Sequence, residues 1–484
     1  MLRWVAGAGL SAIVAIAALE AGFTGPWLDE FWTLELSDTD KGLVSLVRDG
    51  WLHDTHPPLF NAWTTLLASL GVTSIAAGRL LSNGLAVALM IVAARRLSRR
   101  TPEQADFNTV LLLLILSLPQ AIDSFATYRS YFWQIAAVGT LVFVARHVAS
   151  TRVDLDLRKD VDLAVIAVLA TVASIGLHYV GAVFGGLLAG TIALCARRRE
   201  LRRWSALMLL ATAGAGLFVI ASVLAQAPNW AVDLDHTWID LPGLQALGVT
   251  LLLAAGAIGH NPVALAGMRL GRLRGESPWP FVAMVGGVIV AGVAIVLAVH
   301  AFTPIVVERY LIAVAVLVCA LMAVPAARIA RDSLLFGLLA LVSVAVAAAP
   351  LVQSGFRLKW YEGARTIAEI VAACPTTRVF AASGWALGPA AETRAALRED
   401  PVFARAYRLL ADRYGFVVQF IGQNGTAEAT RGDCPVLVWY EHTPNEAEDD
   451  LGAALYATGL TGLSDARLSV IRTATGMVLR ADRP

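Results

Sequence analysis

Long apolar stretches separated by short polar ones run along the first 352 residues of the chain. A membrane's hydrocarbon core needs roughly 20 apolar residues for each spanning helix, and shorter stretches suffice where neighbouring helices shield their ends. Apolar runs of about this length recur throughout this part of the sequence. We therefore predict about eleven spanning helices, at residues 3–23, 75–95, 107–122, 130–148, 161–177, 179–196, 203–225, 243–261, 279–301, 305–327 and 333–352.

A different pattern begins after residue 352. Apolar, β-rich runs alternate with amphipathic helical stretches near 361–373, 389–412 and 446–458. The β-rich runs read "RVFAAS", "GFVVQFIG" and "CPVLVWY". This alternation predicts a small α/β layer. We expect residues 1–352 to form a transmembrane domain with a first outer loop at 24–74, and residues 353–484 to form a separate soluble domain.

Composition agrees with a polytopic α-helical membrane protein. Hydrophobic residues make up 57% of the chain, charged residues only 15%, and the mean hydropathy is +0.66. Soluble domains carry considerably more charge. The net charge of +1 argues against a nucleic-acid partner, since such binding needs an excess of basic residues.

Basic polar stretches alternate with acidic or aromatic ones, which predicts the orientation in the membrane. The basic set, assigned to the cytoplasm, comprises 94–100, 196–203, 268–274, Arg328 and Arg331. The outward set comprises 24–74, 122–129, 178–179, 227–242 and 302–310. An odd number of spans from a cytoplasmic N-terminus also carries residues 353–484 outside. The first span resembles a signal peptide, but its removal would spoil this alternation.

Two of the four cysteines, Cys374 and Cys434, fall in the polar C-terminal part. An oxidising exterior permits a disulfide between them, and two unlinked thiols are the alternative.

Two adjacent acids, Asp29 and Glu30, follow the first span within "GPWLDEFW". One interpretation is an interfacial aromatic belt, in which Trp27 and Trp32 meet lipid headgroups and the acids face water. The other interpretation is functional. Where the dielectric constant falls at the membrane boundary, a carboxylate can stay ionised and still interact strongly with positively charged partners.

Further polar groups mark the outer ends of other spans. Each has an ordinary interpretation: arginines reach lipid headgroups, a histidine before Pro57-Pro58 packs a loop, and tyrosines belong to an interfacial belt. Together on one face they suit an anionic, lipid-borne substrate. The candidate substrate-binding residues are His56, Arg79, Arg129, Tyr131, His178, Tyr179, Glu308, Arg309 and Tyr310.

The order of these motifs is similar to that of a known enzyme class. An acidic pair after the first span, then "HPPLF", "GRLLSNG", an Arg-X-Tyr entering a span and a late "ERYL" resemble integral-membrane glycosyltransferases of the GT-C class. The resemblance is to the bacterial branch related to protein mannosyltransferases, the aminoarabinose transferase of lipid A and the rhizobial galacturonosyltransferases. It covers roughly the first 130 residues through motifs and the remainder through topology.

This resemblance implies a function at the bacterial plasma membrane. It implies a polyprenyl-phosphate sugar donor, and an envelope glycan, lipid or protein acceptor on the outer side. It also implies inversion at the anomeric carbon and a catalytic acid at the position of Asp29. One motif departs from the class, since Thr127-Tyr128-Arg129 stands where relatives typically read Glu-Ala-Arg. Asp123 lies four residues earlier, and dependence on a divalent cation stays open; no other cofactor is implied.

The chemistry of sugar transfer suits these residues. Asp29, with Glu30 beside it, is the candidate base for an acceptor hydroxyl, and the arginines suit the departing phosphate. A transporter or flippase of a lipid-linked envelope precursor is the main alternative, but it is expected to place ionisable residues in mid-span. A scaffold with an external sensor domain would leave the acids and arginines unused.

Overall fold

The chain divides into two compact units in the computed structural model. The first comprises Met1–Gly22 with Leu36–Gly355, and the second comprises Phe23–Glu35 with Phe356–Pro484. A short early segment therefore groups with the C-terminal part, whereas the sequence pattern placed it in the transmembrane domain. The structure describes residues 2–150, 160–198, 201–233, 243–270, 278–302, 307–383, 401–421, 427–429, 433–441, 460–463 and 466–482.

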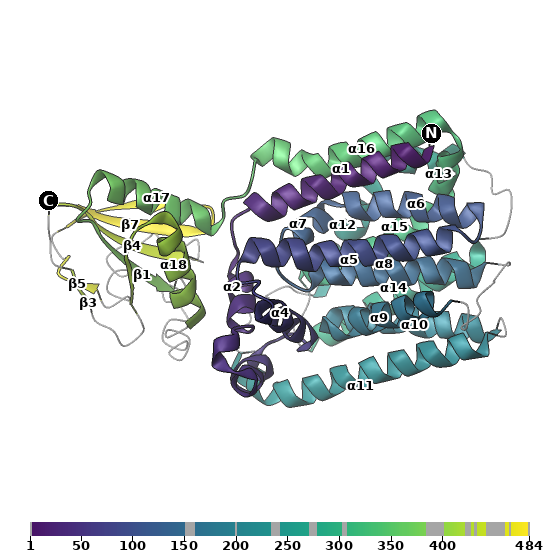
Figure 1. The fold of residues 1–484 in the computed structure, drawn as a ribbon, viewed down its shortest axis with the longest axis horizontal. Helices are drawn as coiled ribbons and strands as arrows, with labels where there is room; N and C mark the ends of the chain where they lie inside the picture. Colours follow the sequence, from purple (N-terminus) through teal and green to yellow (C-terminus); the bar gives the residue numbers. More distant parts are fainter. Residues whose placement is uncertain are drawn as a thin grey trace. The chain divides into compact units, whose positions relative to one another are not determined.

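Long helices build the first unit (Figure 1). They are α1 (Leu2–Phe23), α5 (Ile75–Ser98), α6 (Pro102–Ser117), α7 (Pro119–Phe125), α8 (Tyr131–Ala149), α9 (Val161–Gly176), α10 (Tyr179–Arg198), α11 (Arg202–Asp233), α12 (Gly243–Gly259), α13 (Pro262–Leu270), α14 (Trp279–His300), α15 (Ile312–Ala326) and α16 (Ser333–Ser354). Two 3₁₀ helices, η5 (Glu308–Leu311) and η6 (Ala327–Arg331), flank α15.

Helices occupy all eleven predicted ranges, but not all of them are long enough to span by length and hydropathy. Among the described residues, eight helices meet that criterion, and a ninth span is formed if the bent pair of α6 and α7 counts as one. Helices α9 and α12 are apolar but shorter, with 16 and 17 residues. The protein is thus a multi-pass helical membrane protein, and its described part holds eight or nine candidate spans, against the eleven predicted.

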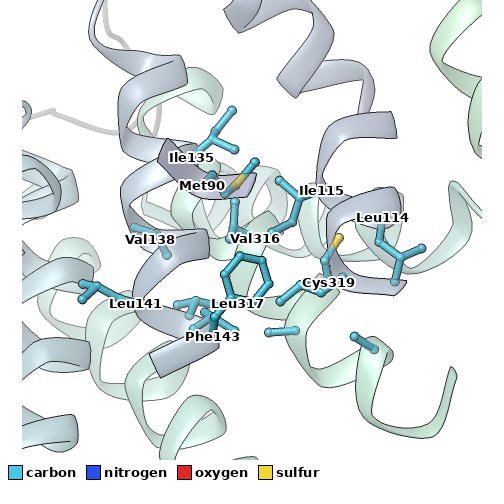
Figure 2. Packing of buried hydrophobic residues seen from close by; sticks show 14 of the residues in the cluster. Met90, Leu114, Ile115, Ile135, Val138, Leu141, Phe143, Val316, Leu317 and Cys319 are labelled. Atoms are coloured by element: carbon cyan, nitrogen blue, oxygen red, sulfur yellow. The ribbon is translucent and has the colours of Figure 1, made fainter. Parts of the chain in front are cut away.

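The core of the first unit lies where α5, α6, α8 and α15 pack together. Side chains of Met90, Ile115 and Val138 interlock there with Val316 and Leu317 (Figure 2). At the edge of the unit α1 lies beside α16 (Figure 1), where a Cβ on Gly9 would come 3.3 Å from that of Ala340. This packing holds the loops that join the spans in fixed places.

The part of the first outer loop that leads to α5 folds into short helices. They are η1 (Thr39–Lys41), α3 (Leu43–Ser45), a π-helical turn η2 (Leu46–Gly50), η3 (Trp51–His53) and α4 (Leu59–Ser69). Trp51 joins two parts of this loop, because its Nε1 donates a hydrogen bond to the carbonyl of Leu36 at 2.8 Å. His56 lies at the turn between η3 and α4, ahead of the two prolines.

The second unit is built on a mixed five-stranded sheet of order β2-β1-β4-β7-β6. Strand β1 (Arg378–Ser383) pairs in parallel with β2 (Val418–Phe420) and β4 (Val436–Glu441), and β7 (Gly476–Asp482) is antiparallel to β4 and to β6 (Arg467–Arg472). Two short strands, β3 (Ala427–Glu428) and β5 (Leu460–Thr461), form a separate pair. The three predicted β-rich runs coincide with β1, β2 and β4; the C-terminal hairpin of β6 and β7 was not predicted.

Three helices belong to this unit: α2 (Leu28–Glu35), α17 (Trp360–Ala373) and α18 (Pro401–Tyr414). Helix α17 and the last part of the predicted 389–412 stretch are confirmed as helical, whereas 389–400 and the predicted helix at 446–458 lie outside the described residues. Cys374 and Cys434 are joined by a disulfide, with their Cα atoms 5.6 Å apart. The structure therefore confirms the disulfide, and not the two unlinked thiols.

Candidate active site

Six of the predicted substrate-binding residues come together in the first unit. They arise from four segments: the turn before α4, the start of α8, the turn before α10, and η5. We call this set the His-Arg-Tyr cluster; its members are His56, Arg129, Tyr131, His178, Arg309 and Tyr310.

The rings of the cluster contact one another at close range. The imidazole of His178 lies 4.4 Å from the ring of Tyr310 and 5.1 Å from that of His56, measured between centroids. Tyr131 completes the group, at 5.9 Å from His178. The guanidinium carbon of Arg309 lies 5.8 Å from the Tyr131 ring centroid, within the range of a cation–π contact. These rings and cations therefore share one small volume.

Asp54, which is not among the predicted site residues, brings a carboxylate next to the His-Arg-Tyr cluster. Its Oδ1 lies 3.5 Å from Nδ1 of His56, and its Oδ2 accepts a hydrogen bond from Asn61 at 2.9 Å. Burial raises the pKa of Asp54, but the hydrogen bond and charge of His56, together with the charge of Arg129, outweigh it and hold the pKa at about 2. Asp54 is therefore a permanent anion that balances part of the cluster's positive charge.

The two histidines have ring nitrogens that the described part of the chain does not satisfy. His56 and His178 are 7% and 3% exposed, and neither Nε2 of His56 nor Nδ1 of His178 has a hydrogen-bond partner. Burial lowers the pKa of His178 well below its usual range, and the charges of His56, Arg129 and Arg309 lower it further. His178 is thus neutral at physiological pH. Buried polar atoms without partners are costly, which makes these nitrogens candidates for binding a ligand.

Helix α11 fixes the turn that carries His56. The buried side chain of Gln226 donates from Nε2 to the carbonyl of Trp51 at 2.7 Å and to that of His56 at 2.9 Å. Its Oε1 accepts a short hydrogen bond from the hydroxyl of Tyr179. Tyr179 is therefore tied to the cluster through Gln226. The sequence gives little signal for Gln226, because it is a single amide inside a long apolar helix.

Two other predicted substrate-binding residues, Arg79 and Glu308, are not members of the His-Arg-Tyr cluster. Arg79 is 1% exposed within α5, and its Nη1 donates to the carbonyl of Ala21 at 3.0 Å, which joins α5 to the end of α1. Glu308 opens η5 and is exposed, although it directly precedes Arg309 of the cluster. Neither has a contact with the cluster rings among those the structure gives.

The predicted catalytic pair stands on α2, in the second unit. Glu30 is fully buried, and its Oε2 accepts a hydrogen bond from the backbone N–H of Trp27 at 2.9 Å. That contact is half of a capping box, with Glu30 as the third residue of the helix. Asp29 is half-buried at the first turn. The neighbouring carboxylates thus have different environments.

The side chains that could bind a metal ion lie apart from one another in the described part of the chain. Among the described residues, no three side chains of the His, Cys, Asp or Glu type come together in a way that would hold a metal. Asp123 is exposed in the last turn of α7, and its backbone carbonyl accepts a hydrogen bond from Thr127 Oγ1 at 2.9 Å. The described residues do not offer a set of ligands that fits a divalent cation.

Comparison with known proteins places this arrangement in a known architecture. No known protein family model matches the chain, and no curated protein matches it in sequence. Solved structures that match in fold include ArnT from Cupriavidus metallidurans bound to undecaprenyl phosphate, and ArnT from the same organism in the apo state. The first has a TM-score of 0.56 at 15% identity, the second 0.54 at 14%, and both alignments cover 99% of this chain and 98% of the other. Over nearly its whole length, this chain therefore has the fold of ArnT.

Proposed function

We propose that this protein is a GT-C glycosyltransferase that moves a sugar from a polyprenyl-phosphate donor to a cell-envelope acceptor. The ArnT-like fold supports the class, and the undecaprenyl phosphate bound in the ArnT crystal structure supports a polyprenyl-phosphate donor. The observation that carries the proposal is the His-Arg-Tyr cluster. Two arginines and two imidazoles come together there from segments far apart in the sequence, and each imidazole has a ring nitrogen without a hydrogen-bond partner among the described residues.

The cluster has the chemistry of a phosphate site. Arg129 and Arg309 offer planar guanidinium groups, which bind phosphate oxygens through paired, charge-assisted hydrogen bonds. Nε2 of His56 and Nδ1 of His178 are available to the same oxygens. Charge on the phosphate grows as the bond to the sugar breaks, so cations fixed here stabilise the transition state more than the bound donor.

The other half of the reaction needs a base. As the acceptor hydroxyl attacks the anomeric carbon, its proton passes to the Asp29 carboxylate while the polyprenyl phosphate leaves with the bonding electron pair. Attack opposite the leaving group inverts the configuration at that carbon. Half-buried Asp29 suits this role better than Glu30, which is fully buried and out of reach of an acceptor.

Purified protein in lipid nanodiscs tests the proposal directly. A panel of polyprenyl-phosphate sugars with radiolabelled hexose, pentose or uronic acid is supplied with an envelope glycolipid extract. We expect one donor to give a labelled lipid and free polyprenyl phosphate in equal amounts, with no product from the Asp29→Asn variant. Movement of intact lipid-linked sugar across vesicle membranes without any transfer would favour a flippase instead.

Arg129 provides the sharpest test of the phosphate site. Arg129→Ala should raise the donor KM at least tenfold and lower kcat, while the acceptor KM stays near wild type, because in this proposal the guanidinium binds the phosphate of the donor and no part of the acceptor. Arg129→Lys should recover part of the loss, since it keeps the charge without the planar fork. Arg48→Ala is the matched control: Arg48 is an exposed arginine of the first outer loop, paired with Asp49. Equal donor saturation in all three variants would remove Arg129 from the phosphate site.

A further inference from the structure

The C-terminal end of α2 is held by a residue from the far end of the chain. Nη1 of Arg405, on α18, lies 3.0 Å from Oε2 of Glu35 and 3.5 Å from the carbonyl oxygen of Leu34. Glu35 is only 8% exposed, and about a third of the Arg405 side chain faces solvent. A cation at this position also meets the negative end of the helix dipole. One nitrogen therefore binds both the last side chain and a terminal carbonyl of the helix.

The rest of the α2 segment is fixed by the same unit. In the middle, the ring of Phe31 packs at a tilt against that of Trp360, a fully buried residue of α17, with their centroids 5.1 Å apart. Ahead of the helix, the N–H of Gly25 donates to the carbonyl of Arg357 at 2.8 Å. A Cβ at Gly25 would stand 1.7 Å from the carbonyl oxygen of Leu358, so only glycine permits this approach. The segment is thus fixed at its start, middle and end.

These contacts differ in kind. The packing of Phe31 and the close approach of Gly25 belong to the core of the unit, so changing either residue would disturb folding. Arg405 is partly exposed, and both of its contacts described above are at the end of the helix. Of the three contacts, it is therefore the one whose removal changes the placement of α2 with the least effect on the fold.

We infer that Arg405 is a positioning residue that, through Glu35 and the Leu34 carbonyl, holds helix α2 and with it the catalytic carboxylate of Asp29. The inference rests on the proposed function of Asp29 and deepens it. Within the second unit, the position of the base then depends on a residue from the C-terminal part of the chain. Misplacing a reacting group by about 1 Å can cost on the order of a hundredfold in rate.

Turnover of the full-length protein in nanodiscs tests this, with sugar transfer measured per folded molecule. Arg405→Ala should lower kcat about ten- to a hundredfold, with the donor KM unchanged, since the phosphate site is untouched. Arg405→Lys should stay within about fivefold of wild type, because a single ammonium nitrogen can replace the single Nη1 that makes both contacts. Arg408→Ala is the matched control, as Arg408 is exposed on the same helix and its Nε donates only to Ala404 of that helix among the contacts given. It should leave kcat unchanged.

Hydrogen exchange supplies a readout that does not depend on activity. In Arg405→Ala, amides of residues 30–35 should exchange faster while those of β4 keep wild-type protection. If Arg405→Ala does not fold, Glu35→Gln carries the test: it weakens the same contact by removing one charge, and should lower kcat and raise exchange in α2 alone.

The outcomes separate the two proposals. Wild-type kcat and wild-type exchange in α2 for the alanine variant, or for Glu35→Gln in its place, would overturn the positioning role while leaving Asp29 as the base. Exchange that rises throughout the unit together with a lower melting temperature would also overturn it, since that describes a stability effect. Full activity of Asp29→Asn, by contrast, would remove Asp29 as the base of the proposed function, on which this inference rests.

Discussion

Adjacent acids on α2 show how different two neighbouring side chains can be. Glu30 points into the unit and closes the first turn through the Trp27 N–H, whereas Asp29 stands at a half-buried position beside it. A helix end needs a partner for its first N–H groups, and Glu30 supplies one. The sequence predicted the pair but not this division, because nothing in "WLDEFW" shows which acid turns inward.

That division leads to a prediction for the two positions. Asp29→Asn keeps the shape but cannot accept a proton, so turnover should fall about 10²–10⁴-fold. Glu30→Gln should stay near wild type in turnover, since glutamine also serves in a capping box. Both are measured as initial rates on folded, inserted protein. More than roughly a tenth of wild-type turnover in Asp29→Asn would remove it as the base, and a dead Glu30→Gln would exchange the roles.

A second buried acid, Glu441 at the end of β4, makes the stability of the folded protein depend on pH. It accepts from Trp439 Nε1 at 2.8 Å and contacts Thr475, and burial raises its pKa to about 8, against these two hydrogen bonds. The folded state therefore binds this proton more tightly than the unfolded chain, where the pKa is 4.5. The stabilisation is fully present below pH 4.5 and is lost as pH rises through 8.

Glu441→Gln should remove that dependence. Between pH 6 and 8 the free energy of unfolding of the wild type should fall with slope up to about 1.4 kcal/mol per pH unit from this group. The glutamine variant should show a flatter profile and a higher melting temperature above pH 8, measured by tryptophan fluorescence. Glu369→Gln, an exposed glutamate paired with Arg365, is the control and should keep the wild-type slope. Identical slopes in all three proteins would exclude Glu441 as the cause.

At the scale of elements, the helices were largely predictable and their contacts were not. The predicted span at 107–122 is divided because Pro119 has no N–H and holds Leu118 in an extended conformation, so α6 and α7 meet at 68°. That signal was present in the sequence. The membership of α2 in the C-terminal unit was not, since it depends on contacts such as Phe31 with Trp360. Hydrophobic periodicity reports which face is buried, not which distant partner buries it.

The same limit applies to the candidate site. Motifs led to His56, Arg129 and Tyr131 because each stands in a short polar stretch beside an apolar run. Gln226 has no such context, and its role appears only when α11 is placed against the loop. Asp54 lies two residues before His56, just ahead of "HPPLF", but only the fold shows that its carboxylate lies close to that ring.

Helix α11 therefore has a role that a single substitution should reveal. Gln226→Leu removes the donor to two carbonyls of the first outer loop and should destabilise the protein by about 1–3 kcal/mol. The donor KM should rise as well, because the turn carrying His56 loses its support. Thermal unfolding and donor titration in detergent measure both effects. Ser222→Ala, one turn away and bonded only to Phe218 within the helix among the contacts given, should change neither.

At the scale of the whole molecule, charge along the chain predicts which parts face outward. A reporter enzyme active only outside should work when fused after residue 240 or 360 and fail after residue 100 or 200. The disulfide between Cys374 and Cys434 agrees with an oxidising location for the second unit. A reporter active only in the cytoplasm serves as the control and should give the opposite pattern. The reverse result for both reporters would invert the assigned orientation.

The link between Arg405 and Glu35 also has a consequence for how the protein is made. These residues are 370 positions apart, so a ribosome adding 5–20 residues per second completes the second partner roughly 20–70 s after the first. During that interval most of the transmembrane helices are synthesised, and α17, whose Trp360 packs against Phe31 of α2, does not yet exist. Helix α2 therefore completes its packing within the second unit only late in the synthesis of the chain.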